Sequence, residues 1–159
     1  MKLHHWLLIA LVIVIFDQIS KQLAAHMLSY GEPLAVMPSF NLTLLHNKGA
    51  AFSFLDNAGG WQRWFFTAIA LIVSVVIIFW LKEAGEEQRW TPLALVLILG
   101  GAIGNVIDRI LFGYVIDFIQ VYYSTFYWPA FNVADSAICV GAAILLLSGW
   151  FLKPQNSNT

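Results

Sequence analysis

Two acidic residues, Asp117 and Asp135, stand in residues 113–136, a stretch dominated by aliphatic and aromatic side chains and without a basic residue. A carboxylate is costly to remove from water in such surroundings, so each acid needs a physical reason to be there. Two carboxyl groups that face each other at low dielectric constant share a proton, because both cannot ionise comfortably. One then acts as a base on water, while the other polarises a carbonyl oxygen. The pair therefore indicates hydrolytic chemistry.

The sequence lacks the motifs that are typical of other catalytic and binding sites. The chain contains no HExxH, CxxC, P-loop or GxSxG sequence, and His46 has no partner at the spacing of a metal site. We therefore expect neither a metal ion nor a cofactor. The net charge of −1 argues against a nucleic-acid partner. A simpler alternative for Asp117 and Asp135 stays open, namely that each caps a helix or pairs with a distant Arg or Lys.

Polar residues recur at helical spacing on both sides of the first acid. Asn105, Asp108 and Arg109 lie at i, i+3 and i+4 and share one helix face. Arg109 either balances Asp108 in a local pair or orients an acid on a neighbouring segment. A second stripe, which we expect to face the bundle interior, consists of Asn132, Asp135, Ser136 and Cys139.

The composition is that of an integral membrane protein. Of 159 residues, 60% are hydrophobic and only 11% charged, about half the charge of a soluble domain, and the mean hydropathy is +0.75. Apolar runs predict a single domain, residues 1–159, with four transmembrane helices at about residues 3–28, 63–82, 91–110 and 131–152. On the first helix, Asp17 and Lys21 stand four residues apart and can pair, with Lys21 reaching towards the interface.

The two regions between these helices, residues 29–62 and 112–130, predict a small β-sheet on the membrane surface. Residues 40–44 alternate apolar and polar side chains, residues 46–49 suggest a turn, and residues 50–54 a returning strand. Tyrosine and tryptophan at 122–128 suit a membrane interface. Four spans put both termini on one side, and a slight excess of basic residues favours the cytoplasm.

Five segments, taken in order, resemble the motifs of lipoprotein signal peptidase, also called signal peptidase II. They are DQISK at 17–21, NKGAAF at 47–52, GAIGNVIDR at 101–109, VIDF at 115–118 and FNVADS at 131–136. The resemblance implies an aspartic endopeptidase of the bacterial inner membrane, with four helices, an extracytoplasmic sheet and an active site near the outer face. Its substrates are prolipoproteins, cut before a cysteine that carries a diacylglyceryl group.

The resemblance also implies roles for individual residues. Asp117 and Asp135 would form the catalytic dyad. Residues that bind substrate or lipid or support the site would be Asn47, Gly49, Asn105, Arg109 and Asn132, with Asp17, Lys21 and Asp108. The expected partners are lipidated prolipoprotein, membrane lipid and the cyclic peptide inhibitor globomycin. Because all these residues lie in one chain, we expect a monomer.

Two functions of other classes compete with this prediction. A small ion or proton carrier would use Asp17, Asp108, Asp117 and Asp135 as a relay across the membrane, which requires acids spread over its depth. A non-catalytic scaffold would use the small residues at 100–104 as a helix contact. It would leave the two dyad acids without a purpose.

Overall fold

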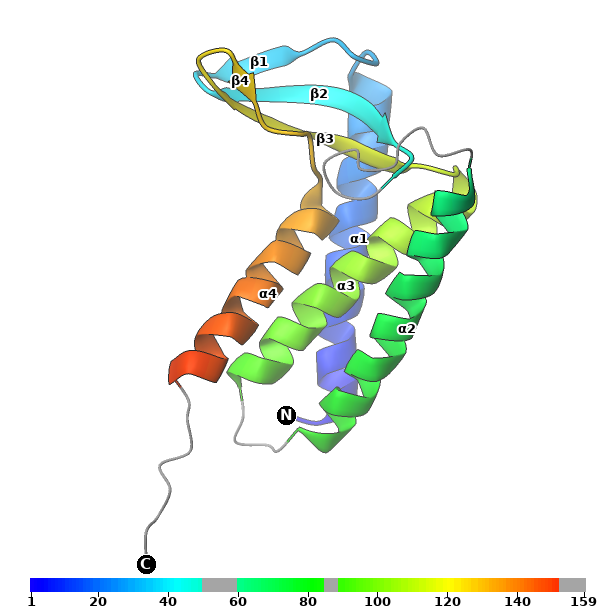
Figure 1. The fold of residues 1–159 in the computed structure, drawn as a ribbon, viewed down its shortest axis with the longest axis vertical. Coiled ribbons are helices and arrows are strands. Elements are labelled where there is room, and N and C mark those ends of the chain that lie inside the picture. The colour runs from blue at the N-terminus through cyan, green and yellow to red at the C-terminus, as the bar shows by residue number, and fades with distance from the viewer. Residues whose placement is uncertain (50–59, 85–88, 152–159) are drawn as a thin grey trace, which may run out of the picture.

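The computed structural model describes residues 1–49, 60–84 and 89–151, which form helices capped at one end by a small sheet (Figure 1). The elements in chain order are α1 (Leu3–Met27), β1 (Leu34–Met37), β2 (Phe40–Asn47), α2 (Trp61–Glu83), α3 (Trp90–Leu111), β3 (Val115–Tyr123), β4 (Phe126–Tyr127) and α4 (Val133–Phe151). The N-terminus lies at the end of the bundle opposite the sheet.

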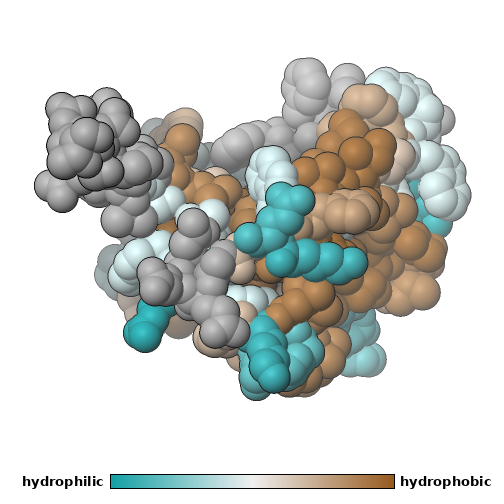
Figure 2. All heavy atoms as spheres, turned by 90° about the horizontal axis from the view of Figure 1, so that it is seen from below, coloured by the Kyte–Doolittle hydropathy of each residue, from teal (hydrophilic) through white to brown (hydrophobic). Residues whose placement is uncertain are grey.

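Helix α3 is the centre of the bundle and packs against the other three helices. Apolar side chains of α1, α2 and α3 form its core, which consists of Trp6, Ala10, Ile77, Leu81, Leu95, Val96 and Leu99. The outer faces of α1 and α2 are apolar as well, with large residues such as Val12 and Ile72 64% exposed. Seen from the end opposite the sheet, hydrophilic residues lie in front of a broad hydrophobic surface (Figure 2). The apolar outer faces of the helices are suited to contact with lipid.

Three helices, α1, α2 and α3, are long and apolar enough to cross a membrane. The fourth, α4, is apolar, but the part searched, Val133–Ser148, is shorter than a full span. Its first residue is 133 rather than 131, because residues 128–131 run beside β3 and Phe131 exchanges backbone hydrogen bonds with Ile119. The ends of α1, α2 and α3 lie within two residues of the predicted ones.

Glycines let the helices approach closely around α3. A Cβ on Gly101 would collide with the backbone oxygen of Ala134 on α4, and one on Gly104 would lie 2.5 Å from Asp17 Oδ2 on α1. The small residues at 100–104 therefore form the helix contact that their spacing predicts, on two sides of α3 at once.

Gly101→Ala is expected to lower the free energy of unfolding by about 1–3 kcal/mol, because the added methyl group overpacks the contact with α4. Ala143→Ser also adds one heavy atom to a helix, at an exposed position on α4, and serves as the matched control. Thermal unfolding of both variants in detergent measures the difference. Equal melting temperatures would show that α4 moves aside at no cost.

The sheet has the strand order β1-β2-β3-β4, and all its neighbouring strands are antiparallel. The predicted turn at 46–49 begins too early, because β2 continues to Asn47 and pairs there with Val115 of β3. Leu45 of β2 is opposite Asp117 of β3. The predicted returning strand at 50–54 lies outside the described residues. Pairing of β2 with β3 brings the end of one strand beside the first acid of the pair.

Candidate active site

Asp117 is held on β3 by two amide side chains. Asn132 Nδ2 donates to Asp117 Oδ1 at 2.7 Å, and Asn47 Nδ2 donates to Asp117 Oδ2 at 3.1 Å. The side chain is buried, with 3% of the residue exposed. This burial, and secondly the negative charge of Asp135, raise the pKa of Asp117 to about 7. A carboxyl group with this pKa is well suited to give or take a proton near neutral pH.

Asp135 belongs to a reciprocal hydrogen-bond pair at the start of α4. The Asp135 backbone N–H donates to Asn132 Oδ1 at 2.9 Å, and the Asn132 backbone N–H donates to Asp135 Oδ2 at 3.3 Å. This is the arrangement of a capping box, in which an N-cap residue and the third helical residue satisfy each other's backbone. Asn132 therefore contacts both acids, Asp117 with its amide nitrogen and Asp135 with its backbone.

Asn105 of α3 joins the second acid to a buried ion cluster. Its Nδ2 donates to Asp135 Oδ1 at 2.8 Å, while its Oδ1 accepts from Lys21 Nζ at 2.9 Å. Lys21 Nζ also lies 2.8 Å from Asp17 Oδ2 and 3.0 Å from Asp108 Oδ2. The three donors of the ammonium group thus have three acceptors.

The ion cluster differs in part from the arrangement that the sequence predicts. The predicted Asp17–Lys21 pair is confirmed, but the expectation that Lys21 reaches towards the interface is wrong, because its side chain is 0% exposed. The ammonium group turns inwards since two carboxylates and Asn105 meet it there. Asp108 pairs with Lys21 on α1, which replaces the local pair with Arg109 that we considered.

The buried carboxylates of the cluster also hold backbone groups next to the acids. Asp17 Oδ1 accepts from the N–H of Ala134, and Asp108 Oδ2 accepts from the N–H of Ile116. Each of these residues directly precedes one of the two acids. The ion cluster therefore fixes the backbone on which Asp117 and Asp135 stand.

Gln18 is a member of this site that the sequence analysis did not single out. Its Nε2 donates to Asp108 Oδ1 at 2.8 Å, to Gly104 O at 3.1 Å and to Asp17 Oδ2 at 3.2 Å. The only sequence signal was its place inside the DQISK segment. Helical spacing from Asp17 gave no reason to select it, because adjacent residues point in different directions.

Arg109 and Gly49 meet at the edge of the site. Arg109 Nη2 donates to Gly49 O at 3.1 Å and Nη1 donates to Asn105 O at 3.4 Å. Asn47 orients the same loop, because its Oδ1 accepts from the Gly49 backbone N–H at 3.0 Å. Arg109 thus links α3 to the end of β2, and its positive charge lies close enough to interact with both Asp117 and Asp135.

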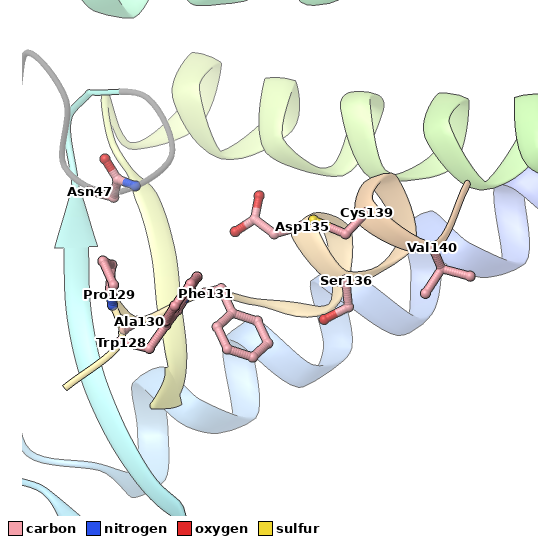
Figure 3. Close-up of a pocket in the computed structure, with 9 residues that line it drawn as sticks. All are labelled: Asn47, Trp128, Pro129, Ala130, Phe131, Asp135, Ser136, Cys139 and Val140. Carbon is pink, nitrogen blue, oxygen red and sulfur yellow. The ribbon is translucent and has the colours of Figure 1, made fainter. Parts of the chain in front are cut away.

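A cavity of about 350 Å³ opens beside Asp135, between the end of β2 and α4 (Figure 3). Its wall is largely apolar and consists of Asn47, Trp128, Pro129, Ala130, Phe131, Asp135, Ser136, Cys139 and Val140. The Asp135 carboxylate points from the start of α4 towards the side where Asn47 lies. A peptide segment with an apolar group attached would fit this combination of walls.

The stripe on α4 differs from its predicted orientation. Asn132 is buried, Asp135 and Ser136 are half-buried, and Cys139 is exposed. The stripe therefore turns from the bundle interior to the cavity at its side, because the close contact at Gly101 fixes a different face of α4 against α3. Within the described ranges, no three His, Cys, Asp or Glu residues are grouped so that they could hold a metal ion.

Comparison with known proteins gives consistent matches over nearly the whole chain. The family model described as signal peptidase (SPase) II matches residues 9–151. The lipoprotein signal peptidase of Alteromonas mediterranea is 55% identical over 142 residues, which is 89% of this chain and 78% of that protein. That of Acinetobacter baumannii is 51% identical over 156 residues, which is 96% of this chain and 89% of that protein.

Two solved structures, both described as a bacterial membrane enzyme studied by the in meso method, share the fold. The first, at 2.3 Å resolution, has a TM-score of 0.82 and 31% identity over 98% of this chain and 95% of its own. The second, at 1.9 Å, has a TM-score of 0.79 and 30% identity over 94% and 95%. This multi-pass membrane protein therefore belongs to the signal peptidase II family.

Proposed function

We propose that the chain is an aspartic endopeptidase that removes the signal peptide from diacylglyceryl-modified prolipoproteins by cutting before the lipidated cysteine. The observation that carries the proposal is the position of Asn132, which contacts both Asp117 and Asp135 beside a cavity. A pair of carboxyl groups linked in this way can activate water and polarise a carbonyl group without a metal ion.

The residues around this pair have two different roles, namely holding the carboxyl groups and binding the substrate. Asn47, Asn105 and Asn132 hold the two carboxyl groups by donated hydrogen bonds. Arg109 and Gly49 stand at the edge of the site, where they bind the substrate backbone or its lipid. Preorganised donors of this kind contribute to catalysis because they need no rearrangement during the reaction.

The buried ion cluster completes the site by fixing the backbone beside the acids through Asp17 and Asp108, with Lys21 between them. The same network argues against the ion carrier. Asp17, Asp108 and Asp135 are joined through Lys21 and Asn105 in one cluster, whereas a relay needs acids distributed across the membrane.

The membrane arrangement that suits this function has α4 as a fourth span and the sheet on the outer face of the bacterial inner membrane. Both termini are then cytoplasmic, and residues 1–159 act as a single domain and a monomer. A prolipoprotein presents a membrane helix followed by a lipidated cysteine, so its cleavage site lies at the bilayer boundary. The apolar wall formed by Trp128, Phe131 and Val140 suits an acyl-bearing residue at this depth.

The experiment that tests the function is cleavage of a diacylglyceryl-modified prolipoprotein by the purified full chain in lipid or detergent. We expect cleavage directly before the lipidated cysteine, none of the same protein without the lipid, and inhibition by globomycin, which we propose binds at the dyad. Mass spectrometry of both products identifies the cut bond. If the two substrates are cut equally, the lipid is not recognised; if neither is cut, the function is wrong.

A further inference from the structure

We infer that the two carboxyl groups are not equivalent at rest: Asp117 carries the proton of the dyad, and Asp135 is ionised and acts as the base on water. The inference deepens the proposed function and rests on it for the chemical roles. The distribution of charge itself follows from the surroundings of each carboxyl group. It can be measured without any substrate.

Several contacts of Asp135 favour its negative charge and oppose the effect of burial. Its Oδ1 accepts from Asn105 Nδ2, and that amide cannot turn over because Lys21 donates to its oxygen. Its Oδ2 accepts from the backbone N–H of Asn132. Asp135 is also in the first turn of α4, where the unpaired N–H groups of a helix stabilise an anion. Lys21 thus acts on Asp135 through Asn105, as a positioning residue.

The surroundings of Asp117 favour the neutral form. Its donors, from Asn132 and Asn47, are uncharged amides like those of Asp135. Asp117 stands on a strand, however, which has only a small dipole and offers no helix start to stabilise an anion. Burial and then the charge of Asp135 give it its pKa of about 7. These effects outweigh the opposing hydrogen bonds and the charge of Lys21.

Other charged groups lie around the pair on every neighbouring element. Helix α1 supplies Asp17 with Lys21, and α3 supplies Asp108 with Arg109. On β2, burial and then the positive charge of Lys48 lower the pKa of His46, which favours the neutral form of this ring. The positive and negative charges around the dyad therefore offset one another. The difference in protonation between Asp117 and Asp135 comes from the immediate contacts of each carboxyl group.

The cavity agrees with this division of roles. Asp135 lines it, whereas Asp117 is not among its lining residues and reaches it through Asn47. A water molecule that enters the cavity therefore meets the ionised carboxylate. As water oxygen bonds to the peptide carbon, Asp135 takes a water proton, and Asp117 gives its proton to the carbonyl oxygen. The product of this step is a neutral gem-diol.

Breakdown of the gem-diol restores both groups. The C–N bond breaks as the nitrogen takes the proton held by Asp135, and a hydroxyl of the gem-diol returns its proton to Asp117. The products are an amine and a carboxylic acid, so one water molecule is consumed and no other reactant is needed. The dyad then has its starting distribution of one proton.

Infrared spectroscopy of the full chain in detergent tests the assignment through the C=O stretch of protonated carboxyl groups. Wild type is expected to show a component that disappears with a midpoint near pH 7. Asp117→Asn should lack this component. Asp135→Asn should keep it, with its midpoint moved to lower pH, because the charge that raises the pKa of Asp117 is gone.

The reverse pattern, with the component lost in Asp135→Asn and kept in Asp117→Asn, would overturn the assignment, and so would an equal partial loss in both. Glu32→Gln, which removes an exposed carboxyl group outside the site, is the matched control and should change nothing in this component. If a variant does not fold, the ¹³Cγ resonances of the two dyad residues in wild type give the same answer, since the midpoint near pH 7 should belong to Asp117 and not to Asp135. Because no readout requires cleavage, failure of the proposed function would be recognised separately.

Discussion

Asp117→Asn and Asp135→Asn are each expected to lower the rate of prolipoprotein cleavage by about a hundred- to ten-thousand-fold, since each removes a group that moves a proton in the transition state. An amide has nearly the shape of a carboxyl group, so the loss should appear in kcat with the fold intact. Single-turnover cleavage, monitored on a gel, separates this loss from weaker substrate binding.

The stability of the Asp117→Asn variant provides a second readout with a defined sign. The pKa of Asp117 in the folded chain, about 7, is above its value of about 3.9 in an unfolded chain. Its contribution to stability is therefore fully present below about pH 4 and is lost as the pH rises towards 7. The variant should lack this part of the decline. Melting temperatures between these pH values measure it.

Glu32→Gln is the matched control for both readouts, because it makes the same chemical change at an exposed position. It should retain wild-type cleavage and the wild-type dependence of melting temperature on pH. If either dyad variant retained near-full activity while folded, that acid would be structural. The mechanism proposed above would then lose its base or its acid.

Local spacing predicted those parts of the site that one helix carries by itself. Asp17 and Lys21 stand four residues apart and form the expected ion pair, and Asn105 and Arg109 both point from α3 towards the end of β2 and the start of α4. Side chains at i and i+4 share a face whatever the helix packs against, so this prediction needs no tertiary information.

Contacts between elements were harder to predict, because they depend on how far each helix is rotated. The partner of Asp108 is Lys21 on α1, and only the packed bundle shows that these residues meet. The same rotation leaves Cys139 exposed at the cavity, where helical spacing suggested the interior. Strand pairing posed a similar difficulty, since β2 pairs with β3, some seventy residues later. Local alternation does not specify a distant partner.

The resemblance to signal peptidase II supplied what spacing could not, namely the choice of Asp117 and Asp135 among the acids. The geometry adds a reason for the Asn132 position. Its side chain caps α4 and holds Asp117, so Ser could replace it as a cap but not as a donor with two N–H groups. An asparagine at a helix start is commonly a cap, so the sequence alone did not indicate that Asn132 also lies between the two acids.

Lys21→Met is expected to have the largest effect on stability, a loss of about 3–5 kcal/mol, because it leaves Asp17 and Asp108 buried without their shared cation. All three side chains are 0% exposed, so water cannot compensate. The measurement is thermal unfolding in detergent, with the amount of protein in membranes as a second readout. Lys82→Met removes an exposed lysine at the end of α2 and should cost less than about 1 kcal/mol.

A triple variant separates stability from positioning. Combining Lys21→Met with Asp17→Asn and Asp108→Asn neutralises the cluster while keeping side-chain oxygens for the backbone N–H groups of Ala134 and Ile116, so much of the stability should return. Cleavage should stay impaired, because the amide oxygen of Asn105 loses its 2.9 Å bond from Lys21 and keeps the longer one, 3.3 Å, from Asn132 Nδ2. If the triple variant regained full activity, Lys21 would serve the fold alone. If Lys21→Met were as stable as wild type, a proton shared by Asp17 and Asp108 would have to replace the ammonium group.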